Sequence, residues 1–297
     1  MTDTMDYLEL EDGLPELRQP TMVAAFRGWN DAGEAASGAV RHLIDSWEAK
    51  LLATIDPEEF FDFTVARPII RVTDEGQRDL RWPSNKFYYH RRDNEDSDVV
   101  LFLGTEPHLK WRTFAKTVRD LFRRLGGSRL LTLGSLVAAT THRRPPPITG
   151  FATEDDLRSR LEGLTINRAR YEGPSGIVGT LHDDWRRAEL PAASLWVGLP
   201  PYLGEAANPR GALALLQELD KLFAFAPDLS ALIEKTRSFE EQVDAALSGN
   251  PELKKYLDAL EKRMDSGITE AGTPDVPPSG DLFGELDAYL REQRQGG

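Results

Sequence analysis

Apolar runs alternate with amphipathic segments along most of this chain, and that alternation limits its fold more than any other feature. Apolar runs without a helical period are typical of buried strands, and they fall at residues 21–26, 51–55, 98–103, 129–137 and 193–197. Segments with a helical stripe of apolar residues follow most of them. Strands that alternate with helices predict an α/β fold, with a mainly parallel sheet covered by helices on both faces.

Composition and pattern divide the chain into five parts. They are an acidic leader at residues 1–20, an α/β core domain at 21–226, a helical extension at 227–265, a flexible linker at 266–280 and a tail with a short amphipathic helix at 281–297. The extension contains two amphipathic segments, so we expect a C-terminal helical appendage. The linker is rich in glycine and proline. Within the core, residues 69–72 and 86–89 predict a hairpin across a polar loop.

Several classes of function are excluded or disfavoured by composition. The chain has no cysteine, which excludes disulfides, a thiol nucleophile and thiolate zinc sites. Its five histidines lack metal-ligand spacing, and no dinucleotide fingerprint or P-loop is present, so we expect no metal and no cofactor. The net charge of −13 disfavours nucleic acid and anionic membranes as partners. No stretch approaches the ~20 apolar residues of a membrane span, and the leader lacks a signal-peptide pattern, so we expect a cytoplasmic protein.

Three loops that follow predicted strands carry the residues best suited to bind a ligand or a partner. Ligands of open α/β sheets bind beyond the carboxyl ends of the strands. We therefore assign a candidate crevice to the following residues: Gly28, Asn30, Asp31, Gly33, Glu34, Glu106, His108, Arg112, His142 and Arg143. Because parallel βα units place successive strand ends along one edge, we expect the loop with Glu106 and His108 to lie beside residues 30–34.

Each loop also has a plainer interpretation. Asp31 and Glu34 have the spacing of a capping box, so the first loop either holds an anion at a helix N-terminus or only caps the helix. Glu106 and His108 either serve acid–base chemistry or form a helix start whose dipole favours the carboxylate. The loop at 142–147, which ends in three prolines, either recognises an anion, presents a rigid edge to a partner or is an exposed basic turn. We assign no catalytic residue, because no complete catalytic constellation is present.

Four segments, taken together and in order, carry a family resemblance. They are GWNDAG at 28–33, GTEP at 104–107, YEGPSGIVG at 171–179 and LPPY at 199–202. In these segments the chain resembles the proteasome assembly chaperone 2 family, in particular its actinobacterial branch, over roughly residues 21–225. The resemblance implies a phosphorylase/hydrolase-like α/β fold, a homo-oligomer for which we favour a trimer, and no established enzymatic activity for the bacterial members.

Two functions remain open at this point. The first is a non-enzymatic assembly chaperone or scaffolding protein that acts through protein–protein contacts, with a protein partner such as proteasome components. The second is a small-molecule enzyme or sensor that binds a nucleoside or a phosphorylated ligand in the crevice at the strand ends. The lack of a complete catalytic constellation favours the first.

The C-terminal tail contains a segment that we expect to dock on a partner or on another subunit. We predict that residues 281–290 form a docking helix, with Phe283, Leu286 and Leu290 on one face, at the end of a flexible tether. A helix this short is marginal alone in water, so it becomes stable when that face is buried. Deletion from Ser266 onward should remove a partner from pull-downs or lower the oligomer mass measured by light scattering. A truncated protein that keeps every partner and its mass would contradict the prediction.

Overall fold

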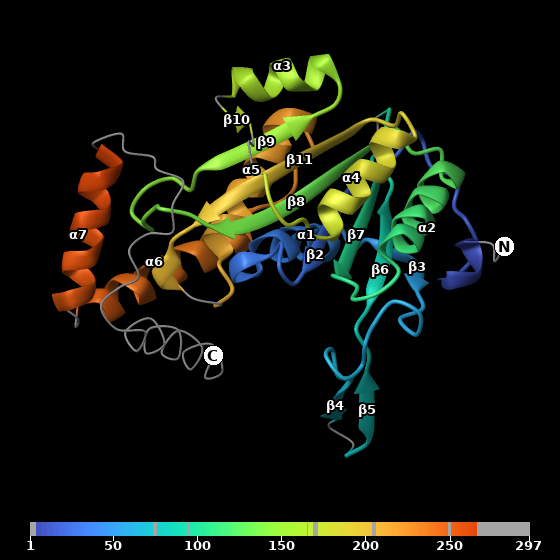
Figure 1. The fold of residues 1–297 in the computed structure, drawn as a ribbon, viewed down its shortest axis with the longest axis horizontal. Coiled ribbons are helices and arrows are strands. Elements are labelled where there is room, and N and C mark those ends of the chain that lie inside the picture. The colour runs from blue at the N-terminus through green and yellow to red at the C-terminus, as the bar shows by residue number, and fades with distance from the viewer. Residues whose placement is uncertain are drawn as a thin grey trace.

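The computed structural model describes residues 4–73, 76–93, 96–164, 166–168, 172–203, 206–248 and 251–265, and within them a nine-stranded mixed sheet forms the centre of the molecule (Figure 1). The order of strands in the sheet is β1-β3-β6-β7-β2-β8-β11-β9-β10. The strands have these bounds: β1 Leu8–Leu10, β2 Thr21–Arg27, β3 Lys50–Ile55, β6 Asn85–His90, β7 Val99–Thr105, β8 Arg129–Val137, β9 Ile148–Ala152, β10 Asn167–Arg168 and β11 Ala192–Leu199.

The centre of the sheet is parallel. β2 pairs in parallel with β7 on one side and with β8 on the other, and β8 pairs in parallel with β11. Antiparallel pairs lie outside this centre, where β6 pairs with β7, β3 with β6, β1 with β3, and β9 with β11. The predicted α/β fold with a mainly parallel sheet is therefore confirmed.

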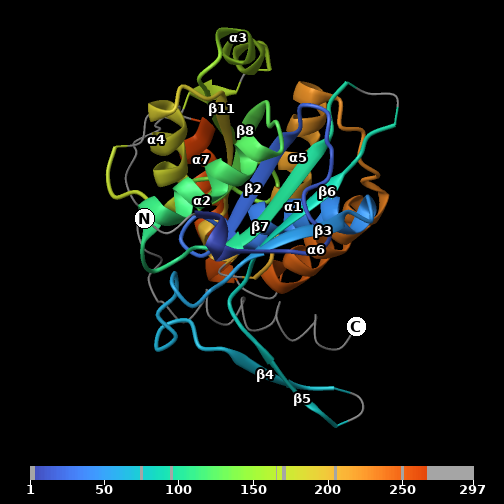
Figure 2. The same cartoon turned by 90° about the vertical axis from the view of Figure 1, so that its right-hand side faces the viewer.

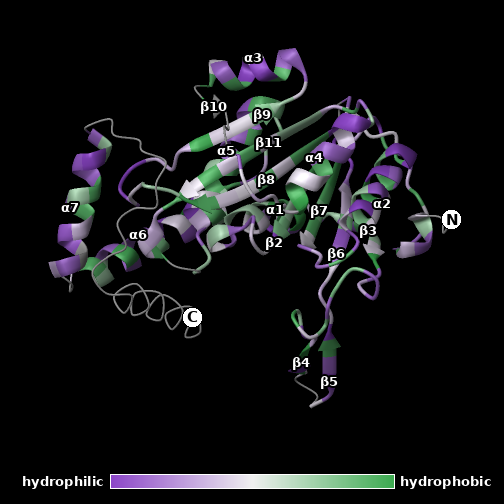
Figure 3. Cartoon of the chain, viewed as in Figure 1, coloured by the Kyte–Doolittle hydropathy of each residue, from purple (hydrophilic) through white to green (hydrophobic). Residues whose placement is uncertain are grey.

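Helices cover both faces of the sheet (Figure 2). The helices around the sheet are α1 Ala35–Ser46, α2 Trp111–Arg124, α3 Asp155–Gly163, α4 Ile177–Arg187 and α5 Pro209–Phe223, with short 3-10 turns η1 Thr4–Tyr7, η2 Ala32–Glu34 and η3 Pro201–Leu203. Side chains of α1, α3 and α5 pack in one hydrophobic cluster, and those of α2 and α4 pack in a second cluster. In Figure 3, hydrophilic and hydrophobic residues are interspersed along α2, and its buried residues recur with helical spacing, as expected of an amphipathic covering helix.

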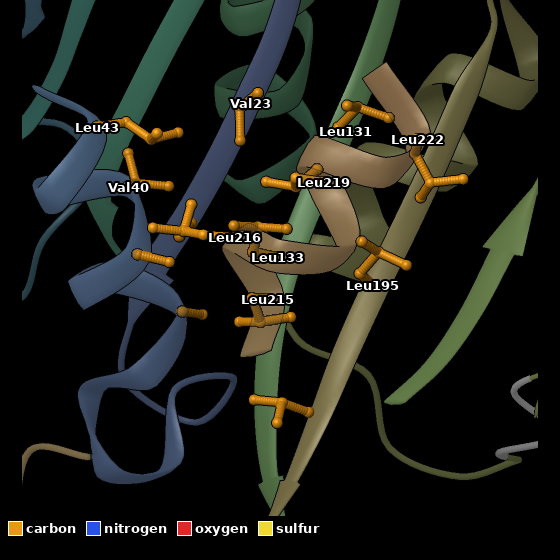
Figure 4. Packing of buried hydrophobic residues seen from close by; sticks show 14 of the residues in the cluster. Val23, Val40, Leu43, Leu131, Leu133, Leu195, Leu215, Leu216, Leu219 and Leu222 are labelled. Atoms are coloured by element: carbon orange, nitrogen blue, oxygen red, sulfur yellow. The ribbon is translucent and has the colours of Figure 1, made fainter. Parts of the chain in front are cut away.

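Strand β2 shows why two helical layers are needed. Its residues 22–26 are all fully buried, and successive side chains of a strand point to opposite faces. Val23 and Ala25 pack in the cluster with α1 and α5, whereas Met22, Ala24 and Phe26 pack in the cluster with α2 and α4. In the first cluster the leucines of α5 lie over β8 and β11 (Figure 4).

Two helices at the C-terminal side, α6 Ser230–Ser248 and α7 Pro251–Asp265, form the predicted helical appendage (Figure 1). They have a small hydrophobic cluster of their own, in which Phe239 and Val243 of α6 and Leu257 of α7 pack with Tyr202 and other side chains near η3. Of the helices in the described part of the chain, none combines the length and the apolar character that crossing a bilayer requires. The predicted tether and docking helix, including Phe283, Leu286 and Leu290, lie outside the described residues.

The predicted hairpin between residues 69–72 and 86–89 is wrong. Residues Ile69–Val72 (β4) pair instead with Arg78–Arg81 (β5) in a separate two-stranded sheet, and β6 joins the central sheet. Phe87 of β6 is fully buried and stacks on Phe102 with 3.9 Å between ring centroids. Burial of this aromatic ring draws β6 into the core, whereas both strands of the short hairpin are exposed.

A close approach between two central strands can be tested with a glycine substitution. Gly134 of β8 lies opposite Trp196 of β11, and a Cβ atom added to Gly134 would clash with the indole ring. Gly134→Ala should therefore lower the free energy of unfolding by about 1–3 kcal/mol, because the tightly packed ring must shift. Urea unfolding measures this loss.

The matched control is Gly163→Ala at the end of α3, where an added Cβ meets nothing within 4 Å. Alanine is a better helix former than glycine, so this variant should be neutral or slightly more stable. Equal losses in the two variants would contradict the role of the close approach.

Candidate functional site

The loops after β2 and β7 meet where these neighbouring strands end. The side-chain Nδ2 of Asn30 donates a hydrogen bond to Oε1 of Glu106 at 3.0 Å, and the backbone N–H of Glu106 donates to the carbonyl of Arg27 at 2.9 Å. Gly28 and Gly33 have positive φ values of 122° and 56°, a conformation that L side chains rarely adopt, so they form the turns of the first loop. The structure thus brings Gly28, Asn30 and Glu106 together.

A third loop completes this site, and it was not among the predicted crevice residues. The backbone N–H of Ile177, the first residue of α4, donates to Oε1 of Glu106 at 2.7 Å. A Cβ atom on Gly176 would lie 2.5 Å from that oxygen, so a larger residue there would displace the side chains of Glu106 and Asn30. The glycine-rich run before α4 was the available sequence signal. We call Gly28, Asn30, Glu106, Gly176 and Ile177 the crevice.

The carboxylate of Glu106 therefore occupies the positive end of α4. Helix N-termini attract anions, because their first N–H groups lack partners within the helix and the helix dipole favours negative charge. Here one oxygen of the chain's own carboxylate accepts from both Ile177 and Asn30. A phosphate or another anion must displace Glu106 before it can bind at this helix end.

Asp31 belongs to the same loop as Gly28 and Asn30, and it caps α1. Only 7% of Asp31 is exposed, and its Oδ1 accepts hydrogen bonds from the backbone N–H groups of Ala36 at 2.9 Å and Ser37 at 3.1 Å. Burial raises the pKa of Asp31, and the hydrogen bonds from Ser37 oppose that rise. The second half of the predicted capping box is absent, because Glu34 has a φ of 46° and its carboxylate lies 3.9 Å from Arg41.

His108 and Arg112 do not reach the crevice. The ring of His108 packs edge-on against Phe61 at 5.6 Å between centroids, and its Nδ1 accepts from the backbone N–H of Asp62 at 3.2 Å. Arg112 is exposed in the first turn of α2. His108 thus holds the segment after β3, so its observed contacts do not pair it with Glu106 for acid–base chemistry.

The loop at 142–144 contacts the chain's own helical appendage. The backbone N–H of His142 donates to Oη of Tyr202 at 2.7 Å, and its ring nitrogens lie 2.6 Å from that Oη and 3.1 Å from Oδ1 of Asp244 in α6. Burial lowers the pKa of His142, and Asp244 opposes this effect. Arg143 lies 3.9 Å from Glu261 of α7. The loop therefore ties α6 and α7 to the core.

Apolar side chains are exposed in the chain segments at the ends of β7, β2 and β8. Their exposed fractions are 61% for Trp29, 48% for Leu109, 43% for Leu136 and 54% for Val137. We call these four residues the strand-end surface. Contiguous exposed apolar residues mark interaction sites on soluble proteins more often than isolated ones do. The strand ends thus carry polar groups that hydrogen-bond to one another and, in the same segments, exposed apolar side chains.

Two further observations concern small ligands. Among the residues that the structure describes, no group of three or more His, Asp or Glu side chains is placed to hold a metal ion. A groove of about 440 Å³ lies away from the crevice, between α1, α5 and α6, and includes Glu34 and His42 in its lining. Of the residues predicted for the candidate crevice, Glu34 lines this groove, whereas Gly28, Asn30, Glu106, Gly176 and Ile177 do not.

The chain is thus an α/β protein whose mixed sheet has a parallel centre and whose C-terminal side carries a helical appendage. At the strand ends, the carboxylate of Glu106 joins two other loops by hydrogen bonds. The model of the PAC2 family matches residues 25–247, and the chain belongs to that family. This confirms the resemblance seen in the four sequence segments. A search of curated proteins finds no match.

Solved structures show the same relationship. A PAC2 family protein from Streptomyces avermitilis is 38% identical, with a TM-score of 0.70, over 76% of this chain and 95% of that protein. A proteasome-assembly chaperone homologue from Mycobacterium tuberculosis is 35% identical, with a TM-score of 0.71, over 80% of this chain and 99% of that protein. A Mycobacterium tuberculosis protein of unknown function is 26% identical, with a TM-score of 0.79, over 96% of both chains.

The carboxylate at the centre of the crevice can be tested by stability measurements. Glu106→Ala should lower the free energy of unfolding by about 1–3 kcal/mol, because it leaves the amide of Asn30 and the N–H of Ile177 without their acceptor. Glu106→Gln keeps an acceptor oxygen and should lose less. Glu172→Ala, at an exposed carboxylate in the same glycine-rich run, is the control and should stay within about 0.5 kcal/mol of the wild type. Equal losses in all three variants would contradict the assigned contacts.

Proposed function

We propose that this protein is a non-enzymatic assembly chaperone or scaffolding protein that acts through protein–protein contacts, with proteasome components as its partners. The strand-end surface is the observation that carries the proposal. Trp29 and Val137 are each more than half exposed beside a crevice whose polar groups bond to one another. Aromatic side chains are enriched in protein interfaces and often dominate their binding energy.

The family supports the proteasome as the source of the partner. The chain belongs to the PAC2 family, and a relative that is 35% identical is described as a proteasome-assembly chaperone homologue. Within that frame we also propose that the protein is cytoplasmic, comes from an actinobacterium and is a homo-oligomer, with a trimer favoured. We propose no cofactor, no metal and no nucleic-acid or membrane partner, in keeping with its acidic charge and lack of cysteine.

The alternative, a small-molecule enzyme or sensor, finds less support in the geometry. A phosphorylated ligand at α4 must compete with Glu106, whose carboxylate accepts two hydrogen bonds there. His108, the residue expected to supply acid–base chemistry, faces Phe61 and Asp62. Both observations disfavour the small-molecule alternative.

Binding to purified proteasome subunits tests the proposal. Native mass spectrometry should detect a complex with an α or β subunit from the same organism, and calorimetry should measure its affinity. The double variant Trp29→Ala/Val137→Ala should bind at least tenfold more weakly, a loss of about 1.4 kcal/mol or more, since truncation of buried aromatic anchors is costly. Ile233→Ala is the matched control, because Ile233 is 51% exposed on α6 and should leave the affinity unchanged.

The opposite outcome is equally concrete. A ligand that binds only the folded state must raise Tm. Because the scaffold proposal includes no small ligand, a thermal-shift screen against nucleosides, nucleotides and phosphate should show no rise in Tm. The absence of a complex with every purified subunit, together with a ligand that raises Tm, would replace the scaffold proposal with the small-molecule alternative.

A further inference from the structure

The hairpin of β4 and β5 has one apolar face, and that face is exposed. In this antiparallel pair Ile70 lies opposite Leu80 and Val72 lies opposite Arg78, so these side chains share one face. Trp82, two residues after Leu80, continues the same alternation. The exposed fractions are 57% for Ile70, 68% for Val72, 47% for Leu80 and 46% for Trp82. We call β4, β5 and Trp82 the arm.

The other face of the arm is mainly polar. Ile69 lies opposite Arg81 and Arg71 lies opposite Asp79, and Nε of Arg81 lies 2.9 Å from Oδ2 of Asp79. In antiparallel sheets with one polar and one apolar face, the apolar face usually packs against other apolar side chains and the polar face contacts water. An isolated hairpin is marginally stable in water at best. Burial of its apolar face against another surface would therefore stabilise it.

The arm points away from the body of its own chain. Both views show β4 and β5 projecting beyond the central sheet (Figures 1 and 2). The ring of Trp82 packs against Phe63 at its base, with 4.7 Å between centroids. Pro68 and Pro83 flank the arm and fix φ at the two positions where it leaves the body, which limits its freedom to fold back.

The charge of the arm indicates which kind of surface would cover its apolar face. Residues 69–82 contain three arginines and three acidic residues, whereas the whole chain has a net charge of −13. Within the two strands, the apolar face carries Arg78 and no acidic residue. An apolar face that carries one positive charge matches a negative surface that also exposes apolar side chains.

The N-terminal leader of the same protein is such a surface. Residues 4–17 contain five acidic residues and no basic one, and all five are exposed: Asp6, Glu9, Glu11, Asp12 and Glu16. Leu10 and Leu14 are exposed among them, by 37% and 39%. The leader also contributes β1, which pairs with β3 on one side and ends the sheet among the described strands. An edge strand of this kind is open to pairing with another chain.

We propose that the apolar face of the arm docks on the acidic leader of a second copy of this chain, with Ile70 and Leu80 against Leu10 and Leu14. Arg78, which lies on the same face of the arm as Ile70 and Leu80, then faces the carboxylates of the leader. Arm and leader are different surfaces, so the contact is head-to-tail, and such contacts close into rings when the rotation between copies allows it. The inference rests on the proposed function in one respect, namely that the protein is a homo-oligomer.

Light scattering on the full chain tests which surface joins the copies. The wild type should give a mass above the 33.2 kDa of the monomer, and Ile70→Ser/Leu80→Ser should give the monomer mass. Ile69→Ser is the matched control, because Ile69 is 62% exposed on the same strand but belongs to the opposite face, and it should keep the wild-type mass. Circular dichroism should show that every variant remains folded, since these side chains lie outside the core.

Cross-linking identifies the surface on which the arm docks. The chain has no cysteine, so single introduced thiols react without background. A mixture of Leu80→Cys and Leu10→Cys proteins, treated with a short bis-maleimide, should give a covalent dimer that contains one of each, whereas Ile69→Cys mixed with Leu10→Cys should give none.

Three results would overturn the inference. A wild-type monomer would reject both this contact and the proposed homo-oligomer. An Ile70→Ser/Leu80→Ser protein that keeps the oligomer mass would reject the arm while leaving the homo-oligomer in place. Cross-links between two Leu80→Cys arms, without links from the arm to Leu10→Cys, would show that arms pack on arms and not on the leader.

Discussion

Burial of the central strands on both faces is the constraint on which the rest of the structure depends. Strand β2 has no exposed residue between Met22 and Phe26, and its side chains alternate between two separate hydrophobic clusters. Water is excluded from both faces, so one helical layer must cover each. Strands and helices therefore alternate along the chain, and most polar side chains are confined to the strand ends and the outer helix surfaces.

The strand ends then have to satisfy their own polar groups. Three chain segments meet there, and the carboxylate of Glu106 accepts hydrogen bonds from the side chain of Asn30 and the first N–H of α4. A buried or half-buried donor without an acceptor costs free energy, so this arrangement stabilises the loops. The same bonds leave the helix end with a carboxylate already in place. Trp29, Leu136 and Val137 remain exposed near these strand ends, and this exposure is the basis of the proposal that the edge binds a protein.

Local sequence determined the elements whose pattern lies within one segment. The buried run at residues 21–26 became β2, and Asn208 before Pro209 became the cap of α5, where its Oδ1 accepts from Gly211 at 3.0 Å. These outcomes depend on side-chain period, on the fixed φ of proline and on a nearby acceptor, all of which are visible in a few neighbouring residues. The family resemblance likewise depended on short segments, and the PAC2 match confirms it.

The sequence by itself thus determined the α/β class, the order of most strands and helices, and the meeting of the loops after β2 and β7, because parallel neighbours place those loops on one edge. Only the tertiary structure decided that Glu106 bonds to Ile177, that His142 turns to Tyr202 and Asp244, and that residues 85–90 enter the sheet. The first two outcomes depend on contacts between residues far apart in the chain. In the third, two strand pairings compete, because residues 85–90 could pair with residues 69–72 or with β7. Local propensity cannot choose among such pairings, because the burial and hydrogen bonds that decide them form only when the distant segments meet.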